Sequence, residues 1–356
     1  MCVASVVLMA WNERDAVLQT GAITEIEGVA IADVPSDSVE AANDGKLVHI
    51  NATALTDAVL EFPTFGVREN AIRLRLDTSI YQWKEKKRKD DNRTRYSYSK
   101  KWVDQPIDSS RFHRPSGHSN DDSEKHFHDD SEQAKTVNFG AFLLSKKLIS
   151  QIKEEEKFAF DKSIAMDVRP QGFVRGGVFQ TGTPDNPQIG DERVEVFVVG
   201  PKHEATVMAR QSANTFASYE TKVGIPKEIL YVGTLTKPEV IGQQRNEAAM
   251  KRWLFRGLGF ILFWIGSALA LTPIRAIASF IPFAGNILEG AIGFVTFLLA
   301  AIVATVVIGI AWFAVRPILT CILFAVAATA LFFLYRQKSP GEAAPAERFG
   351  PPPLPS

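Results

Sequence analysis

The first candidates for chemistry are the histidines of one polar segment, because four of them fall within 16 residues. These histidines and the aspartates among them are His113, His118, His126, His128, Asp121, Asp122, Asp129 and Asp130. Imidazole and carboxylate groups together form ligand sets for zinc or nickel. A preorganised metal site also needs rigid elements, and Ser109–Lys135 has neither helical nor strand spacing. We therefore expect a solvated loop here and assign no metal ligand.

A second candidate is a basic run flanked by two alternating segments. Its cationic side chains are Lys84, Lys86, Lys87, Arg88, Lys89, Arg93 and Arg95. Three acidic residues, Glu85, Asp90 and Asp91, interrupt the run. The pattern predicts the exposed tip of a β-hairpin, and contact with anionic lipid headgroups is the alternative.

Other catalytic patterns are absent from the sequence. It contains no nucleophile-elbow serine motif, phosphate-binding loop, dinucleotide-binding glycine pattern or zinc-protease motif. Its two cysteines, Cys2 and Cys321, both lie in apolar segments, so the polar segment has neither a disulfide nor a thiolate site. His49 alternates with Leu47 on one strand face and is predicted to be packed. We assign no catalytic residue, cofactor or metal, and expect no enzymatic activity.

The histidine-rich segment and the basic run belong to a polar domain that spans residues 12–250. Alternating apolar and polar residues predict strands at Lys46–Ile50, Ile72–Trp83, Arg93–Trp102, Arg193–Val199, Ala205–Arg210 and Ile229–Leu235. Helical spacing predicts helices at Leu143–Phe158 and Glu239–Trp253. The segments Gly45–Ile50 and Gly190–Val194 are faintly alike, which raises a repeated unit as an option. The expected class is α+β, with a β-rich domain.

The charge distribution separates this domain from a membrane module at 251–335. The whole chain has 40 basic and 40 acidic residues, which excludes a strongly basic nucleic-acid binder. From Gly257 to Tyr335, however, the only charged residues are Arg275, Glu289 and Arg316. A membrane helix needs about 20 apolar residues, and Arg316-Pro317 marks a break. We expect three complete spans, at about 253–274, 288–314 and 317–335.

Smaller features complete the organisation. Trp253, Trp312 and Tyr335 are expected at the membrane interface, whereas Trp264 falls inside a span and has no predicted role. The spacing of apolar residues from Pro273 to Pro282 predicts a short interfacial helix. The apolar run 1–11 is about half a span long, so we expect a partial, truncated transmembrane helix there. The segment 336–356 has the composition of a disordered, proline-rich tail.

Several of these segments resemble one known family, in the same order along nearly the whole chain. The matching motifs are Asn43–Ile50, Tyr81-Gln82-Trp83, Thr94–Tyr98, Gly117-His118, Gly190–Val194 and Trp312–Pro317. With these motifs the sequence resembles the transmembrane protein 43 (LUMA) family. The resemblance implies four transmembrane helices and a large domain between the first and second. It also implies that this domain lies outside the cytosol, which the nearly equal Lys and Arg counts on the two sides leave open.

The resemblance further implies a role and partners. Animal members are associated with nuclear-envelope organisation, lamin and emerin binding, and self-association, without enzymatic activity. We therefore expect a non-enzymatic, multispan scaffold or membrane-organising or sensing protein that binds the lipid bilayer and envelope proteins and binds no nucleic acid. It would lie in the endoplasmic reticulum or inner nuclear membrane of a eukaryote, or in a bacterial inner membrane with a periplasmic domain. The alternatives are a membrane-bound metal-dependent hydrolase using the histidine-rich loop, and a channel or transporter component.

Overall fold

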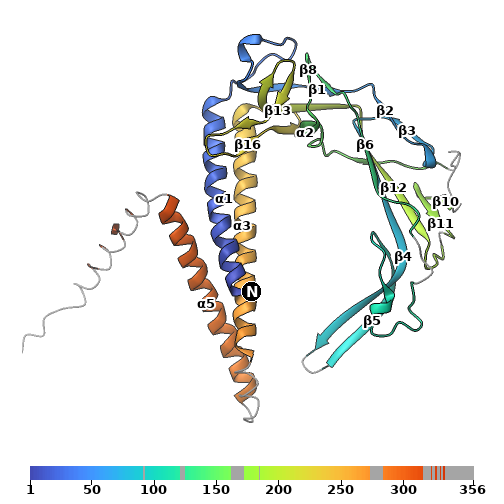
Figure 1. Ribbon diagram of the computed structural model, residues 1–356, viewed down its shortest axis with the longest axis vertical. Helices are drawn as coiled ribbons and strands as arrows, with labels where there is room; N and C mark the ends of the chain where they lie inside the picture. Colours follow the sequence, from blue (N-terminus) through green and yellow to red (C-terminus); the bar gives the residue numbers. More distant parts are fainter. Residues whose placement is uncertain are drawn as a thin grey trace, which may run out of the picture. The chain divides into compact units, whose positions relative to one another are not determined.

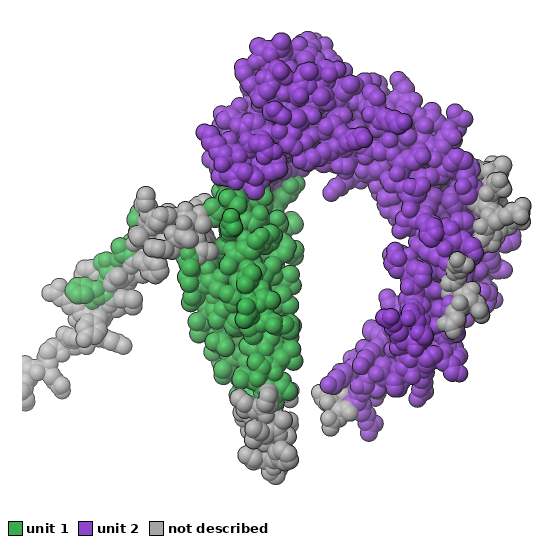
Figure 2. Space-filling model, viewed as in Figure 1, with its two compact units in different colours: residues 1–21, 245–356 green, residues 22–244 purple. Residues whose placement is uncertain are grey.

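The chain forms two compact units (Figure 2). Unit 1 comprises residues 1–21 and 245–356, and unit 2 comprises residues 22–244. The computed structural model describes residues 1–90, 93–120, 125–161, 172–183, 185–272 and 284–315, with isolated positions between 322 and 332. The expected interfacial helix at Pro273–Pro282 and the proline-rich tail lie outside the described residues, and so does almost all of the expected third span.

Three long helices are described, and they confirm part of the predicted helical organisation (Figure 1). They are α1 (Cys2–Val29), α3 (Lys237–Ala270) and α5 (Ala284–Val315). The helix predicted from Glu239 continues without a break into the first predicted span, and α5 contains the second. Both α3 and the Ala291–Ile310 segment of α5 are long and apolar enough to cross a membrane. Helix α1 continues well past Trp11, because Asn12–Val29 lacks proline and is rich in helix formers.

The predicted helix at Leu143–Phe158 is wrong. Only Lys146–Ile149 is helical (α2), with the Ser145 hydroxyl accepting a hydrogen bond from the Leu148 N–H at 3.2 Å. The guanidinium of Arg73 then donates to the Ile152 carbonyl at 2.9 Å. This long-range contact takes a carbonyl that a continuing helix would use, so tertiary structure overrides the helical spacing.

The first sheet of unit 2 closes on itself. Its strand order is β1-β7-β8-β14-β13-β17, and β1 also pairs with β13, which joins five of the strands in a ring. Its strands are β1 (Leu47–Leu55), β7 (Asn138–Phe139), β8 (Phe142–Leu143), β13 (Lys202–Ser212), β14 (Thr215–Ala217) and β17 (Ile229–Val232). Buried residues such as Ile50, Phe139 and Val207 form its core.

The second sheet is built around one long strand, β4 (Arg73–Asp90). The strand order is β10-β11-β12-β4-β5, with β6 on β4 and β9 on β12. The other strands are β5 (Arg93–Val103), β6 (Asp130–Gln133), β9 (Glu156–Lys157), β10 (Gly172–Arg175), β11 (Val178–Thr181) and β12 (Glu192–Val199). Leu74, Phe127 and Phe179 are among its buried core residues.

The six predicted strands are all present, and β4 and β5 form the predicted hairpin. Two small hairpins complete unit 2, namely β2 (Val59–Phe62) with β3 (Val67–Asn70) and β15 (Tyr219–Glu220) with β16 (Pro226–Lys227). The two faintly similar glycine-led segments start strands in different sheets, because β1 belongs to the closed sheet and β12 to the other.

Candidate functional site

The histidine-rich segment is held by contacts to different parts of the second sheet. His126 Nδ1 lies 2.8 Å from Glu192 Oε1, and the backbone N–H groups of His126 and Phe127 donate to the same carboxylate. Three donors therefore satisfy a fully buried Glu192. Further along, the Asp129 carboxylate accepts hydrogen bonds from the Thr78 N–H at 2.8 Å and hydroxyl at 2.7 Å.

Two further histidines of the segment stack on tyrosines of β5. The His118 ring lies 3.8 Å from the Tyr98 ring and the His113 ring lies 4.1 Å from the Tyr96 ring, both centre to centre. Most described residues of Ser109–Lys135 are exposed, as expected of a solvated loop, but these contacts pack the loop against the sheet. Within the described residues, which exclude Asp121 and Asp122, no three His, Cys, Asp or Glu side chains are grouped to hold a metal ion. The geometry does not support the hydrolase alternative.

His49 is buried in unit 2, as predicted. Its Nε2 lies 3.0 Å from the Leu235 carbonyl oxygen, and its Nδ1 lies 3.5 Å from an Asp33 carboxylate oxygen. Burial lowers the pKa of His49 below its ordinary value of 6.5, because the protonated ring loses its water; the hydrogen bond to Leu235 opposes this shift. The ring therefore has a structural role between β1 and the segment that precedes α3.

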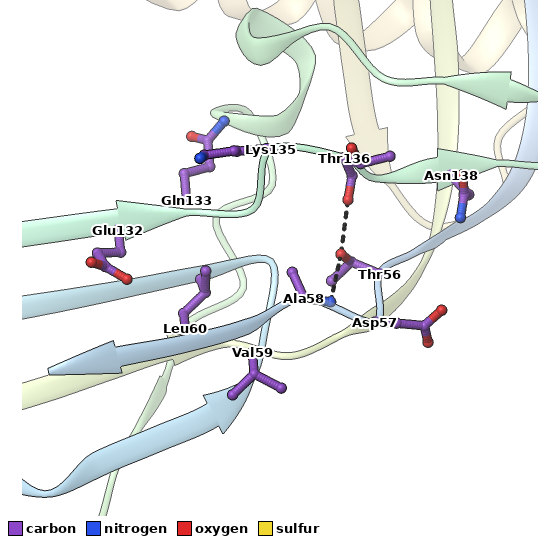
Figure 3. A pocket seen from close by; sticks show the side chains of 10 residues that line it. All are labelled: Thr56, Asp57, Ala58, Val59, Leu60, Glu132, Gln133, Lys135, Thr136 and Asn138. Carbon is purple, nitrogen blue, oxygen red and sulfur yellow. Dashed lines mark hydrogen bonds between the residues drawn. The ribbon is translucent and has the colours of Figure 1, made fainter. Parts of the chain in front are cut away.

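An open groove lies where β2 begins, beside the connection from β6 to β7 (Figure 3). The Thr56 hydroxyl donates to the Thr136 carbonyl at 2.8 Å and accepts from the Ala58 N–H at 3.2 Å. Figure 3 shows the carboxylates of Glu132 and Asp57 at opposite ends of this groove. The groove therefore offers an open, polar surface lined by acidic and basic side chains.

The strongest polar contacts of unit 1 join α1 to α3, which pack antiparallel. Arg256 donates to both carboxylate oxygens of Glu13, at 2.5 and 2.7 Å. The exposed fractions of these side chains are 12% for Arg256 and 3% for Glu13, so this is a desolvated, bidentate ion pair. One turn away, Lys251 pairs with Asp15 at 3.0 Å and the Asn12 amide donates to the Arg252 carbonyl at 3.2 Å.

Two tryptophans contact the basic side chains of this part of α3, where its apolar segment begins. The Lys251 ammonium lies 5.7 Å from the Trp11 ring, and the Arg256 guanidinium lies 4.9 Å from the exposed Trp253 ring. Tryptophan and basic side chains concentrate where a bilayer meets water. The arrangement supports the predicted interfacial position of Trp253, and it adds Trp11, which the sequence did not indicate.

On the side of these charges towards the apolar segment, α1 and α3 approach each other closely. A Cβ atom added to Gly259 would lie 2.4 Å from the Met9 side chain, so only glycine allows this approach of α1. Trp264 donates from its indole nitrogen to the Gly293 carbonyl at 3.2 Å, and its ring meets Phe297 edge to face. These contacts with α5 explain Trp264, which had no predicted role.

Sequence comparisons relate the chain to known proteins. The model of the family described as Transmembrane protein 43 matches residues 80–317. Rat transmembrane protein 43 is 26% identical over 334 residues, which cover 89% of this chain and 83% of the rat protein. The human protein is 26% identical over 87% of this chain and 82% of its own length. The transmembrane protein 43 homolog of Drosophila melanogaster is 27% identical over 91% of this chain and 89% of its own. No solved structure matches the chain.

The family match and the structure agree on the broad class of protein. The matched residues make up more than half of the chain and include the polar hairpin, α3 and α5. Both membrane-capable helices lie entirely within the matched region. The chain therefore belongs to the transmembrane protein 43 family and is an integral membrane protein.

Proposed function

We propose that the chain is a non-enzymatic membrane scaffold, in which the β-rich domain of unit 2 binds other membrane proteins or a second copy of the chain. The observation that carries this proposal is the continuity of α3. This helix has 34 residues, begins in unit 2 and continues as the apolar segment of unit 1. At 1.5 Å per residue it is about 50 Å long, without a flexible linker between domain and span.

Helix α3 is firmly attached within unit 2 at its start. Val240 and Ile241 are buried there, and the Lys237 ammonium donates to the Ala30 carbonyl at 2.7 Å. The Gln244 amide nitrogen donates to the Tyr231 hydroxyl of β17 at 2.8 Å. A force on the closed sheet would therefore act on the helix itself.

Within unit 1, the ion pair of Glu13 and Arg256 resists sliding of α1 against α3. Helix α3 thus has fixed partners in each of the two units. In this proposal a partner bound to the domain changes the packing of the spans by shifting α3. The mechanism is mechanical and requires no reaction centre.

The finer topology belongs to the same proposal. Three complete spans follow the domain, and the domain lies outside the cytosol. In a eukaryote the protein would lie in the endoplasmic reticulum and inner nuclear membrane, with lamin-like and emerin-like partners. In a bacterium it would lie in the inner membrane with a periplasmic domain. Family resemblance supports these assignments.

The test is photocrosslinking of the full chain in membranes, with a photoreactive residue placed on exposed positions of unit 2. We expect covalent adducts with a second copy or with another membrane protein. If no position yields an adduct, the scaffold proposal fails.

Coupling is tested by Asn246→Pro, with Asn246→Ala as the matched control. Proline removes a helical hydrogen bond and clashes with the preceding turn, which costs about 3 kcal/mol in a helix interior. Asn246 is an exposed residue of α3, so the alanine variant keeps the helix. We expect proline alone to abolish any change that partner binding causes in crosslinks between α1 and α3. An unchanged response in the proline variant would contradict mechanical coupling.

A further inference from the structure

The β4–β5 hairpin extends beyond the rest of its sheet as a two-stranded ribbon (Figure 1). Strand β12 pairs with β4 only from Arg73 to Ile80, and β6 only from Arg73 to Leu76. Beyond Ile80, β5 alone pairs with β4 among the described residues. At about 3.4 Å per residue, the ten residues of β4 that follow Ile80 extend roughly 34 Å.

One face of this ribbon is basic. Side chains alternate between the faces of a strand, so the even positions of β4 share a face with the odd positions of β5 that pair with them. Lys84 pairs with Ser99, Lys86 with Ser97, and Arg88 with Arg95. The cationic side chains of this face are all exposed: Lys84, Lys86, Arg88, Arg93, Arg95 and Lys101.

The opposite face carries aromatic side chains that pack against a loop, and it also carries Lys87, Lys89 and Lys100, which are exposed. Tyr96 and Tyr98 of β5 point to this side and stack on His113 and His118 of the packed loop. The carboxylate of Glu85 lies on the same side, where it accepts hydrogen bonds from the Tyr98 hydroxyl and the His113 N–H. The ribbon beyond Ile80 therefore directs Glu85 away from the basic face, and the acidic position in register on that face is Asp90, opposite Arg93 at the end of the strand.

The basic face gathers several cations along one surface. In the register of the two strands, Arg95 stands directly opposite Arg88. No carboxylate among the described residues forms an ion pair with Lys84, Lys86 or Arg95. An anionic surface laid along this face would compensate several cations at once.

We propose that the basic face of the β4–β5 ribbon binds the anionic headgroups of a lipid bilayer. Protein interfaces are depleted of lysine and enriched in aromatic side chains at their centre, whereas the aromatic residues of this ribbon lie on the opposite face. Headgroup binding needs only regularly placed basic side chains, each of which contributes by charge near the membrane surface. This contact is separate from the transmembrane helices and does not depend on the scaffold proposal.

The test uses the full chain in nanodiscs of zwitterionic lipid, incubated with vesicles of phosphatidylcholine alone or mixed with phosphatidylserine. Binding is measured by vesicle flotation. The variant Lys84→Gln/Lys86→Gln/Arg95→Gln removes three charges from the basic face. The matched control, Lys87→Gln/Lys89→Gln/Lys100→Gln, removes three charges from the other face of the same ribbon.

We expect the chain to bind phosphatidylserine vesicles selectively, with an affinity that falls as salt is added. The basic-face variant should bind about a hundredfold more weakly, and the control variant much less so. Equal binding to both vesicle types, or equal losses in the two variants, would overturn the proposal. So would stronger competition by polyglutamate or by single-stranded DNA than by anionic vesicles, because the surface would then be specific for an acidic protein or a nucleic acid. A matching thermal unfolding temperature in all three chains ensures that a loss of binding reports on the surface.

Discussion

The two units differ in where their large apolar side chains lie: unit 2 buries many of them, whereas unit 1 exposes many of them. In unit 2, the large apolar residues are interior, and Ile50 and Phe139 are fully buried. In unit 1, Leu254 is 68% exposed and Phe294 is similarly exposed, whereas the charged Glu13 is buried between two helices. A soluble domain gains stability by removing apolar surface from water. Helices in a bilayer lack that driving force and associate through packing and polar contacts, so the same side chains have different roles in the two units.

The largest expected effect comes from breaking the buried ion pair of unit 1. Glu13→Ala leaves the Arg256 guanidinium buried without its carboxylate, which should cost about 3–5 kcal/mol. The measurement is the free energy of unfolding of the chain in detergent micelles or nanodiscs. The double variant Glu13→Leu/Arg256→Met replaces the pair with apolar groups and should recover most of the loss. Equal stability of Glu13→Ala and the wild type would show that this pair does not hold α1 to α3.

The next effect compares apolar truncations in the two units. Ile50→Ala opens a cavity in the closed sheet and should destabilise unit 2 by about 2–5 kcal/mol. Leu254→Ala removes an outward-facing side chain of α3 and should change stability by less than about 0.5 kcal/mol. Both are measured by thermal unfolding in nanodiscs. A large effect of Leu254→Ala would mean that a further element covers this part of α3.

A smaller effect is expected at the contact between α3 and α5. Trp264→Phe keeps a ring against Phe297 but removes the indole N–H that donates to the Gly293 carbonyl. Loss of one such hydrogen bond should cost about 0.5–1.5 kcal/mol. Disulfide trapping between cysteines introduced on α3 and α5 measures the population of the packed state. Trp264→Leu, which also removes the ring contact, should lower it further.

The smallest effect is a pH dependence specific to unit 2. Because the pKa of His49 is lowered by burial, the unfolded chain takes up a proton at this position before the folded chain does. The stabilising contribution is complete above pH 6.5 and decreases as the pH falls from 6.5 towards the lowered value. Unfolding by urea between about pH 5 and pH 8 should show this loss in the wild type and a flatter profile in His49→Gln. His128→Gln, at an exposed position, should keep the wild-type profile.

Features with a local cause could be predicted from the sequence. The strands of the hairpin follow from alternation, and the membrane-capable segments of α3 and α5 follow from their length and lack of charge. The polar part of α1, Asn12–Val29, was not recognised, because its buried apolar residues, such as Ala16, Ile23 and Ile26, are few and lie among polar ones. The packed histidine loop was missed because ring stacking on β5 has no periodicity along the chain.

The site contacts depend on residues far apart in the sequence. Glu13 and Arg256 are 243 positions apart, and their pairing follows only from the antiparallel register of α1 and α3. The sequence does place an acidic residue just after the first apolar run and a basic residue just before the next. That coincidence was the one available signal, and it does not identify which charges meet.

The closed ring of strands also determines when the domain can be completed. Asn51 of β1 pairs with Thr206 of β13, 155 residues later. At a synthesis rate of about 5–20 residues per second, β1 waits roughly 8–30 seconds for its partner. During that time its apolar side chains and hydrogen-bonding edge are open to other chains, which makes folding slow and exposed to aggregation. The ring of strands can therefore close only after β13 has been synthesised.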